Sequence, residues 1–557
     1  MIPKVKKQQI TGGFADCRAI SWKLAAGTDE RVSREAYSIA ESTENGISAS
    51  IEHKNGDSES YELTVTPEEI KICSDSAQGA FYALQTLKQL LSENAEKVRC
   101  QQITDAPDMK YRGFYQDVTR GKIPTLETLK SLADTMAFYK MNSLQLYVEH
   151  VFEFREYEFC REQLGYLTKE EIRELDRYCK TKFIDLVPSV SLFGHLYHLL
   201  SNEKYRHLSE LPDYQPTRHY WLERMQHHTI NPTLEESFSV IKSLIDQYLE
   251  VSTSEYFNIC CDETFDLGTG ANAGKDKGKL YFDFVKKIIT YLHEKGKTVM
   301  MWGDIILQHP EYIDQLPEGV IFLNWGYDQN PDEEQYKKVA ESGREQILCP
   351  GTSSWNAFTE HVDVEEGNIS ALAAYGHKYH AAGILNTNWG DWGNIASLSM
   401  AMYGMVLGAA LAWSKETTAD GAFRAEASQL LFGNRDTVAI LKELSAIRYA
   451  ADWEKVVDGH SDRIVSAEDY EKAFTLCRDC LEKVKELSFR EELVKREAIS
   501  AIEGYEMMLS LCAKADGLTV SGKNSIPAWL EEYKTLWLIR NKPSELDELI
   551  RVIEKRL

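Results

Sequence analysis

The sequence predicts an α/β protein: a (β/α)8 TIM barrel preceded by a small α+β domain and followed by a helical C-terminal region. Short apolar segments alternate with amphipathic ones eight times in the middle of the chain. A strand-rich stretch comes before them, and only helical periodicity comes after them. We therefore divide the chain into residues 1–105, 106–414 and 415–557.

The first part has the pattern of a small sheet with one long helix. Residues 60–76, SYELTVTPEEIKICSDS, alternate as two strands around a turn. Residues 77–93, AQGAFYALQTLKQLLSE, then have the apolar spacing of a helix, and TDAPDM at 104–109 looks like a linker.

The central part contains eight strand candidates, each a short apolar run that ends in polar or aromatic residues. They are residues 111–118, 143–150, 183–191, 256–263, 298–305, 320–328, 346–355 and 383–393. Helical segments such as 125–140 and 280–296 separate them, which predicts a closed parallel barrel with its site at the carboxyl ends of the strands. A doubly wound open sheet is the alternative, but no glycine-rich phosphate loop follows any of these strands.

The last part reads as long amphipathic helices, at residues 436–456, 467–487, 491–515 and 544–557. We expect these helices to pack on the barrel and to offer a possible homodimer face. No residue pattern in them indicates chemistry.

Composition excludes several classes of protein. The chain has 557 residues, 43% of them hydrophobic and 27% charged, as in soluble globular proteins, with a formal charge of −24. Such an acidic chain is a poor partner for nucleic acid or an anionic membrane. The most apolar stretch, residues 397–413, is better explained as an internal helix than as a membrane span. With no apolar leader visible, we expect a cytoplasmic protein.

The eleven cysteines are odd in number and scattered, which favours reduced thiols over a disulfide framework. Cys477 and Cys480 form a lone CxxC in a helical stretch, without the second pair that a zinc site needs.

The predicted strand ends would bring one set of side chains together in a barrel. The set consists of Arg112, Asp117, Arg120, Gly194, His195, Asp262, Glu263, Trp302, Asp304, Trp325, Tyr327, Trp355, Trp389 and Asp391. Indole faces stack on the C–H surfaces of pyranoses and charged groups bind hydroxyls, so this composition indicates a sugar site.

The segment YFNICCDE places Cys260, Cys261, Asp262 and Glu263 in a row, which permits a metal, redox or acid–base site. Adjacent residues on a strand face opposite sides, so the two cysteines cannot ligate one ion and are expected in the core. Neighbouring carboxylates repel each other's charge, which helps to keep one protonated near neutral pH. A carboxylic acid of this kind can protonate the leaving oxygen of a glycoside.

Several of these segments together resemble glycoside hydrolase family 20, the β-N-acetylhexosaminidases, from about residue 62 to about residue 393. Residues 61–91 resemble the small domain before the barrel of that family, and YRGFYQDVTR resembles its first barrel strand, with the substrate-binding arginine at Arg112. LFGHLYHLL resembles the family's Pro-Gly-His turn with Phe193 in place of proline, and residues 229–263 resemble the segment that ends in its Asp-Glu pair. MWGDI and NWGD resemble the tryptophan-bearing ends of strands five and eight.

The chain also departs from the family pattern. Asn258 stands where the family usually has histidine, and Cys260 and Cys261 replace two glycines. VPSVS replaces Glu-Ile-Asp, and CPGTSSWNAF lacks the tyrosine that many members have. These changes indicate a divergent subgroup.

The resemblance implies exo-acting, retaining hydrolysis of terminal β-linked GlcNAc or GalNAc, in which the 2-acetamido oxygen of the sugar is the nucleophile. It implies that Glu263 is the general acid and base and that Asp262 orients the acetamido group. Arg112 and Asp391 would bind hydroxyls, Tyr327 would donate to the acetamido oxygen, and His195 would also bind the substrate. The tryptophans would line the site: Trp302, Trp325, Trp355 and Trp389. The expected partner is a small-molecule or oligosaccharide substrate, and no metal or cofactor is called for.

Two other functions stay open at this point. One is a sugar-binding barrel without catalysis, which the retained Asp262–Glu263 pair disfavours. The other is a glycosidase for a sugar without an acetamido group, which would need a separate protein nucleophile about 5 Å from Glu263.

Overall fold

The computed structural model describes residues 1–94, 96–225, 228–519 and 525–557. Eight parallel strands close into a barrel in the order β10-β11-β12-β13-β14-β7-β8-β9, which confirms the predicted fold class. The strands are β7 (Tyr111–Asp117), β8 (Ser143–Val148), β9 (Asp185–Val190), β10 (Tyr256–Asn258), β11 (Thr298–Trp302), β12 (Ile321–Trp325), β13 (Gln346–Cys349) and β14 (Gly383–Asn388).

Helices surround the barrel, and α5, α9, α10, α11 and α12 pack on its strands. They are α3 (Leu126–Phe138), α4 (Arg161–Leu164), α5 (Lys169–Thr181), α6 (Tyr197–Ser201), α7 (Tyr220–Glu223), α8 (Glu235–Leu249), α9 (Lys277–Glu294), α10 (Glu334–Glu341), α11 (Val362–Lys378) and α12 (Tyr403–Trp413). Thr168 and Glu171 form a capping box at the start of α5.

One of the eight predicted β-then-α units differs. After β11 the chain forms two short 3-10 helices, Ile306–Gln308 and Pro310–Gln315, instead of an α-helix. Pro310 and Pro317 stand in this segment, and proline lacks the N–H that a continuing α-helix needs.

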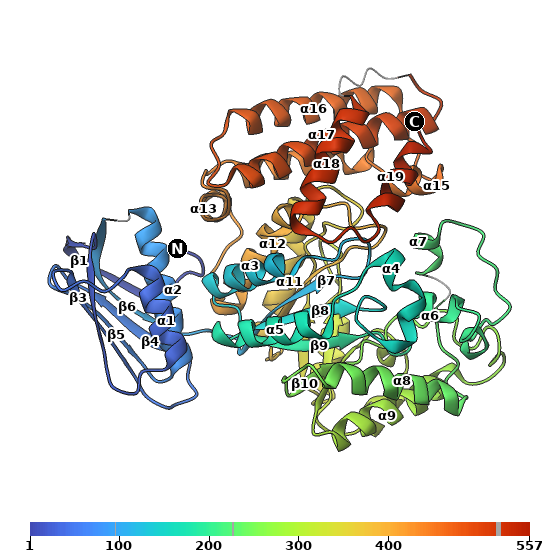
Figure 1. The fold of residues 1–557 in the computed structure, drawn as a ribbon, viewed down its shortest axis with the longest axis horizontal. Coiled ribbons are helices and arrows are strands. Elements are labelled where there is room, and N and C mark those ends of the chain that lie inside the picture. The colour runs from blue at the N-terminus through green and yellow to red at the C-terminus, as the bar shows by residue number, and fades with distance from the viewer. Residues whose placement is uncertain (95, 226–227, 520–524) are drawn as a thin grey trace.

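The N-terminal domain is a six-stranded sheet with order β1-β6-β4-β5-β3-β2, and it lies beside the barrel (Figure 1). Its strands are β1 (Lys7–Asp16), β2 (Ile20–Leu24), β3 (Ile47–His53), β4 (Tyr61–Val65), β5 (Glu69–Ser74) and β6 (Lys97–Asp105). Helices α1 (Glu30–Ile39) and α2 (Ala77–Glu93) pack against it, so the two strands and the helix predicted for residues 60–93 are present.

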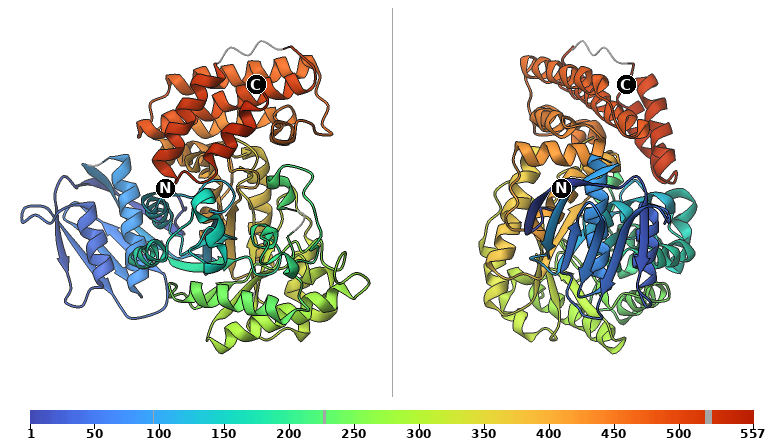
Figure 2. Two further views of the ribbon diagram at one scale, coloured as in Figure 1. Left: turned by 45° about the vertical axis from the view of Figure 1, so that its right-hand side comes forward. Right: turned by 90° about the vertical axis from the view of Figure 1, so that its left-hand side faces the viewer.

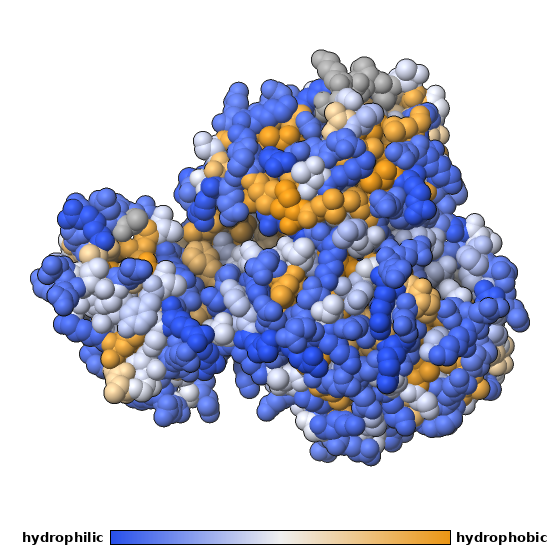
Figure 3. Space-filling view, viewed as in Figure 1, coloured by the Kyte–Doolittle hydropathy of each residue, from blue (hydrophilic) through white to orange (hydrophobic). Residues whose placement is uncertain are grey.

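The C-terminal helices form a layer over the barrel (Figure 2). They are α13 (Gly421–Phe432), α14 (Thr437–Leu444), α15 (Trp453–Asp458), α16 (Ala467–Glu486), α17 (Glu492–Ala515), α18 (Ile526–Arg540) and α19 (Leu546–Glu554). The face in Figure 3 is mostly hydrophilic, but apolar side chains gather over these helices, and α18 exposes Leu538 and Ile539. A homodimer through this region stays a prediction.

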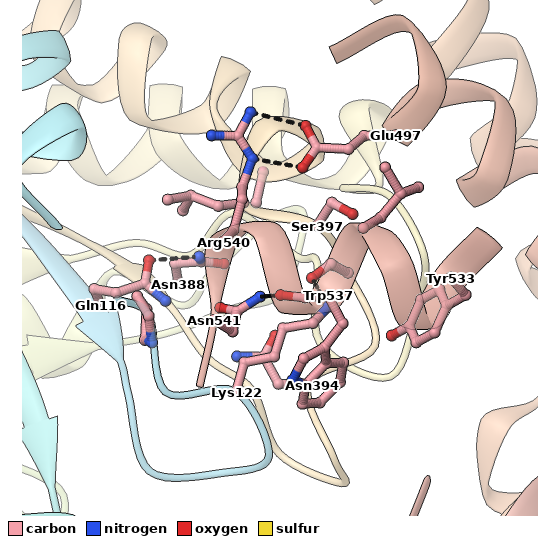
Figure 4. A pocket seen from close by; sticks show the side chains of 15 residues that line it. Gln116, Lys122, Asn388, Asn394, Ser397, Glu497, Tyr533, Trp537, Arg540 and Asn541 are labelled. Carbon is pink, nitrogen blue, oxygen red and sulfur yellow. Dashed lines mark hydrogen bonds and ion pairs between the residues drawn. The ribbon is translucent and has the colours of Figure 1, made fainter. Parts of the chain in front are cut away.

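A small cavity of about 20 Å³ lies where the C-terminal helices meet the barrel loops (Figure 4). Lys122 Nζ donates to the Ile395 carbonyl at 3.1 Å and lies 4.9 Å from the ring centre of Trp537. Burial lowers the pKa of Lys122 to about 7. Arg540 Nε and Nη2 bind Glu497 at 2.5 and 3.0 Å. These contacts fix α17 and α18 to the loops beside the site.

The stretch at 397–413 forms an internal helix, as predicted: every residue of α12 is buried. In the described part of the chain, no helix is long and apolar enough to cross a bilayer. All eleven cysteines are free thiols.

Candidate active site

The Asp262–Glu263 pair sits in a turn directly after β10. The strand ends at Asn258, whose Oδ1 accepts the N–H of Cys260 at 2.9 Å and turns the chain out of the sheet. Cys260, Cys261 and Glu263 all have left-handed backbones, with φ of 53°, 65° and 48°. Residues with a Cβ rarely adopt this region, so the turn is held under local strain.

The two cysteines are core residues, as predicted, although the strand stops before them. Cys260 is 0% exposed and points inside the barrel, where its Sγ lies 3.4 Å from Ser189 Oγ and 3.8 Å from Tyr115 Oη. Cys261 is 1% exposed and packs in the outer core, and its carbonyl accepts from Tyr281 Oη at 2.8 Å. Packing inside and outside the barrel therefore anchors the turn that presents Asp262.

His195 joins the two carboxylates. Its Nε2 lies 3.3 Å from Asp262 Oδ2 and 3.5 Å from Glu263 Oε2. Burial lowers the pKa of His195, but the charge of Asp262 and the hydrogen bonds to both carboxylates outweigh burial and raise it to about 10. His195 is 1% exposed, so it positions the carboxylates and has almost no surface for a substrate.

The His195 ring is itself held from behind by a second histidine. The rings of His195 and His228 stack with centroids 4.5 Å apart. The backbone N–H of His195 donates to His228 Nδ1 at 2.6 Å. Asp266 Oδ2 accepts the backbone N–H groups of His228 and Thr229 at 3.2 and 3.1 Å. Burial, followed by the charge of His195, lowers the pKa of His228 to about 4, so this ring stays neutral and accepts.

Asp262 and Glu263 have different environments. Asp262 is 7% exposed, and although burial raises its pKa, the charge of His195 outweighs burial and lowers it overall. Its Oδ1 is buried and has no hydrogen-bond partner among the described residues. The side chain of Glu263 is 24% exposed. The pair thus offers one buried carboxylate with a free acceptor atom and one carboxyl group that solvent can reach.

Asp304 supports the turn from the end of the neighbouring strand. Its Oδ2 accepts the backbone N–H of Glu263 at 3.0 Å. Burial and the charge of Asp262 raise the pKa of Asp304 to about 8, so a neutral carboxyl group lies beside the pair at neutral pH.

Arg120 is the arginine of this site. Its Nη1 lies 3.1 Å from Asp391 Oδ1, its Nε lies 3.4 Å from Glu149 Oε1, and its Nη2 lies 3.4 Å from His195 Nδ1. The guanidinium carbon is 5.2 Å from the ring centre of Trp389. Arg120 Nη1 also lies 3.6 Å from Asp117 Oδ2, but Asp391 is nearer.

The structure contradicts the prediction that Arg112 binds substrate. Arg112 is the second residue of β7, at the amino end of the strand, and it faces the N-terminal domain. Its Nη1 lies 2.8 Å from Glu59 Oε2, its Nη2 donates to Tyr82 Oη at 3.0 Å, and its Nε donates to the Lys140 carbonyl at 2.9 Å. With a side chain 0% exposed, Arg112 is a buried link between two domains.

The predicted aromatic residues form two groups. Trp302 and Trp389 pack on Tyr115 with ring centroids 5.2 and 5.0 Å apart. Trp302 is 0% exposed, so this predicted sugar-stacking residue forms a floor beneath the site and has no surface that a sugar can touch.

The second aromatic group lies at the ends of β12 and β13 and is half-buried. Trp325 stacks on Tyr327 with ring centroids 5.2 Å apart. Trp355 contacts the same tyrosine ring edge-on, also with ring centroids 5.2 Å apart. Trp389 Nε1 donates to Tyr327 Oη at 2.7 Å, which leaves the phenolic hydrogen available to another acceptor. This indole N–H links the two groups.

Asp391 follows β14 and faces Arg120. Burial raises its pKa to about 6, against the opposing effect of Arg120. Its backbone carbonyl accepts from Arg224 Nη2 at 2.7 Å. Arg120 and Asp391 together offer charged donors and acceptors of the kind that bind sugar hydroxyls.

Sequence reasoning missed Glu149, Tyr147 and His228. Tyr147 Oη donates to Glu149 Oε1 at 2.9 Å, and both residues lie within reach of Arg120. Glu149 directly follows β8, so the strand-end rule that selected Asp262 could also have selected Glu149. His228 lies in a loop, and no sequence pattern identified it.

The chain is similar in sequence and fold to known proteins. Residues 109–423 match the model of the glycosyl hydrolase family 20 catalytic domain, and residues 16–106 match the model of domain 2 of that family. A β-hexosaminidase of Akkermansia muciniphila is 34% identical over 160 residues, which is 25% of this chain and 32% of the relative. The chain spans 32% to 45% of the length of three such curated relatives.

Solved structures share the fold. The Flavobacterium johnsoniae chitobiase has a TM-score of 0.65 at 18% identity, with 99% of each chain covered. The exo β-N-acetylglucosaminidase of Vibrio harveyi in complex with N-acetylglucosamine has a TM-score of 0.63 at 19% identity, with 77% of this chain and 76% of that chain covered. Because the catalytic-domain model alone matches more than half of the sequence, the chain belongs to glycosyl hydrolase family 20.

Proposed function

We propose that this protein is an exo-acting β-N-acetylhexosaminidase that releases terminal β-linked GlcNAc, GalNAc or both, with retention of configuration. The observation that carries the proposal is the pair of unlike carboxyl groups: Asp262 is buried with a free acceptor atom, and Glu263 is reachable from solvent. The family relationship and the sugar in the Vibrio harveyi structure support the same substrate class.

In the first step the acetamido oxygen of the bound sugar attacks its own anomeric carbon. The new O–C1 bond forms as the glycosidic C1–O bond breaks, and Glu263 gives its proton to the departing oxygen. The products are the free aglycone and a bound oxazolinium ion. In the second step Glu263 takes a proton from water, the water oxygen bonds to C1, and the oxazolinium ring opens to restore the acetamido group.

Asp262 has a different task in both steps. Its unpartnered Oδ1 accepts the acetamido N–H, which turns the carbonyl oxygen toward C1, and its negative charge stabilises the positive charge that develops on the ring. His195 holds Asp262 Oδ2 in place at 3.3 Å, so the carboxylate is oriented before the substrate arrives.

Binding of the sugar falls to Arg120, Asp391 and the aromatic residues. Arg120 takes the hydroxyl-binding role that the sequence had assigned to Arg112, because it is the arginine that shares the barrel end with Glu263. Tyr327 Oη donates to the acetamido oxygen, since its own acceptor side is filled by Trp389 Nε1 at 2.7 Å. Trp325, Trp355 and Trp389 offer ring surface to the pyranose.

A panel of nitrophenyl sugars tests the proposal: β-GlcNAc, β-GalNAc, β-glucose and β-galactose. We expect cleavage of one or both acetamido sugars and of neither plain hexose. Glu263→Gln should lower kcat by about 10³-fold, in the range of general acid catalysis. Cleavage of β-glucoside at a comparable rate, or unchanged turnover in Glu263→Gln, would contradict the proposal.

A further inference from the structure

Three side chains of metal-ligand type meet beside the candidate active site, although they are far apart in the sequence. His150 follows β8, His198 lies in α6 after β9, and Glu545 precedes the first turn of α19. One donor atom from each lies within 4.8 Å of the others. The His150 and His198 rings are 4.3 Å apart between centroids.

These donor atoms are buried without ordinary partners. His150 is 2% exposed, and neither of its ring nitrogens has a hydrogen-bond partner in residues 1–94, 96–225, 228–519 and 525–557. Within the same ranges, His198 Nε2 and Glu545 Oε1 also lack one. Buried polar atoms are nearly always satisfied in native proteins, so four unpaired donor atoms in one place need a common explanation.

The cluster contains one carboxyl group, Glu545, and the Arg224 guanidinium lies beside it. A neutral imidazole ring has a lone pair to give to a metal ion, and His150 Nδ1, His150 Nε2 and His198 Nε2 are buried without a hydrogen-bond partner among the described residues. Glu545 Oε2 is already held by Trp221 Nε1 at 2.6 Å. Its Oε1 has only a contact of 3.5 Å with Arg224 Nη1, too long for a hydrogen bond, which an ion on Oε1 would replace.

We propose that His150, His198 and Glu545 form a zinc-binding site. Two imidazole nitrogens and one carboxylate oxygen are a donor set that suits Zn²⁺, with water in the fourth position, whereas Ca²⁺ and Mg²⁺ prefer oxygen alone. Donor atoms around a tetrahedral zinc ion are about 3.4 Å apart, so small rotations of the three side chains close the site.

The group His195, Asp262 and Glu263 also offers donors within 4.8 Å of one another. There, however, the imidazole nitrogen already lies between two carboxylates, at 3.3 and 3.5 Å. Those two carboxyl groups belong to the proposed reaction, which is why the ion is assigned to the cluster around His150.

The zinc ion would tie the C-terminal region to two barrel loops next to the substrate-binding arginine. Glu149, the neighbour of His150, lies 3.4 Å from Arg120 Nε. Arg218 and Trp221 already bind Asp458 and Glu545 across the same boundary, and Figure 1 shows α6 and α7 below the end of α19. The ion is structural, takes no part in the bond-breaking steps, and does not depend on the proposed function.

Zinc titration of the full chain, stripped with a chelator and dialysed, tests the site. Calorimetry should give one equivalent of Zn²⁺, and Co²⁺ in its place should give the visible absorption of a tetrahedral complex. Saturating Zn²⁺ should raise Tm by about 3 °C, because an ion that binds only the folded state stabilises it.

Variants of the proposed ligands test where the ion binds. His150→Ala and His198→Gln should each weaken binding at least about tenfold, whereas His207→Ala should keep it, because that exposed histidine pairs with Glu236 elsewhere. His198→Gln decides the matter if His150→Ala does not fold, since His198 is half-buried and glutamine fills similar volume. No stoichiometric binding, binding that survives His198→Gln, or binding that only Glu263→Gln abolishes would each overturn the proposal.

Discussion

Two buried arginines eight positions apart mark the two ends of the same barrel strand. Arg112, at the amino end of β7, pairs with Glu59 at 2.8 Å and donates to carbonyls of the chain around it. Arg120, just beyond the carboxyl end, lies among Asp391, Glu149 and His195. Both side chains are nearly inaccessible, at 0% and 4% exposure.

Burial and charge therefore do not tell a structural arginine from a functional one here. What differs is the kind of partner. The donors of Arg112 are used up by carbonyls, a tyrosine and one carboxylate, whereas Arg120 faces several carboxylates beside a free acceptor on Asp262. Position along a barrel strand decides which set of partners an arginine meets.

The largest effect should come from Arg120→Met. We expect kcat/KM for an aryl acetamido sugar to fall about 10³-fold, because two charged hydrogen bonds to substrate are together worth about 4 kcal/mol. Steady-state kinetics on the folded variant measures this. A loss below about tenfold would remove Arg120 from the binding site.

Arg112→Met should lower stability and leave activity nearly unchanged. The free energy of unfolding should fall by about 3 kcal/mol, because Glu59 is left without its buried partner, while kcat/KM should stay within about threefold. Denaturant unfolding and kinetics on one sample measure both quantities. Glu59→Gln in the same chain should return part of the stability, and a large loss of kcat/KM without loss of stability would contradict the assignment.

A smaller effect is expected at Tyr327. Tyr327→Phe removes the hydroxyl that accepts from Trp389 Nε1, and kcat should fall about tenfold if this hydroxyl also donates to the acetamido oxygen. The matched control is Tyr111→Phe, at the amino end of β7, where the hydroxyl contacts Ser143 at 2.6 Å and should not affect kcat. Equal effects of the two changes would show that only packing is involved.

A pH dependence of stability is also expected from His195. Its pKa is about 10 in the folded protein, against an ordinary value of 6.5. A raised pKa means that the stabilisation is complete below pH 6.5 and is lost as the pH rises through 10, by about 1.4 kcal/mol per pH unit at most. Wild-type unfolding free energy should therefore fall relative to that of His195→Gln between these limits, and parallel curves would contradict the ionised ring.

Much of this architecture follows from sequence pattern. Each barrel strand is short, apolar and followed by polar or aromatic residues, so the positions of Asp262, Glu263, Trp389 and Asp391 at one end could be predicted. The prediction that Arg112 binds substrate was wrong. Arg112 and Arg120 stand in the same segment, and the family resemblance was applied to Arg112 instead of Arg120. The strand-end rule alone favours Arg120, which comes three residues after β7 ends.

Other features depend on tertiary contacts that no local pattern encodes. The 3-10 helices after β11 are not among them, because two prolines in the sequence favour them. The left-handed cysteines of the catalytic turn and the meeting of His150, His198 and Glu545 follow from packing between distant segments. Chain separation hides such a cluster until the barrel and the C-terminal helices are placed together.

The central claim is that the acetamido oxygen of the sugar is the attacking atom. Its most direct test is the hydrolysis of aryl glycosides whose N-acetyl methyl group carries zero, one, two or three fluorines. Fluorine withdraws electrons from the carbonyl oxygen, so kcat/KM should fall steeply with each substitution. Rates that do not change along the series would show that another group attacks C1 and would contradict the account.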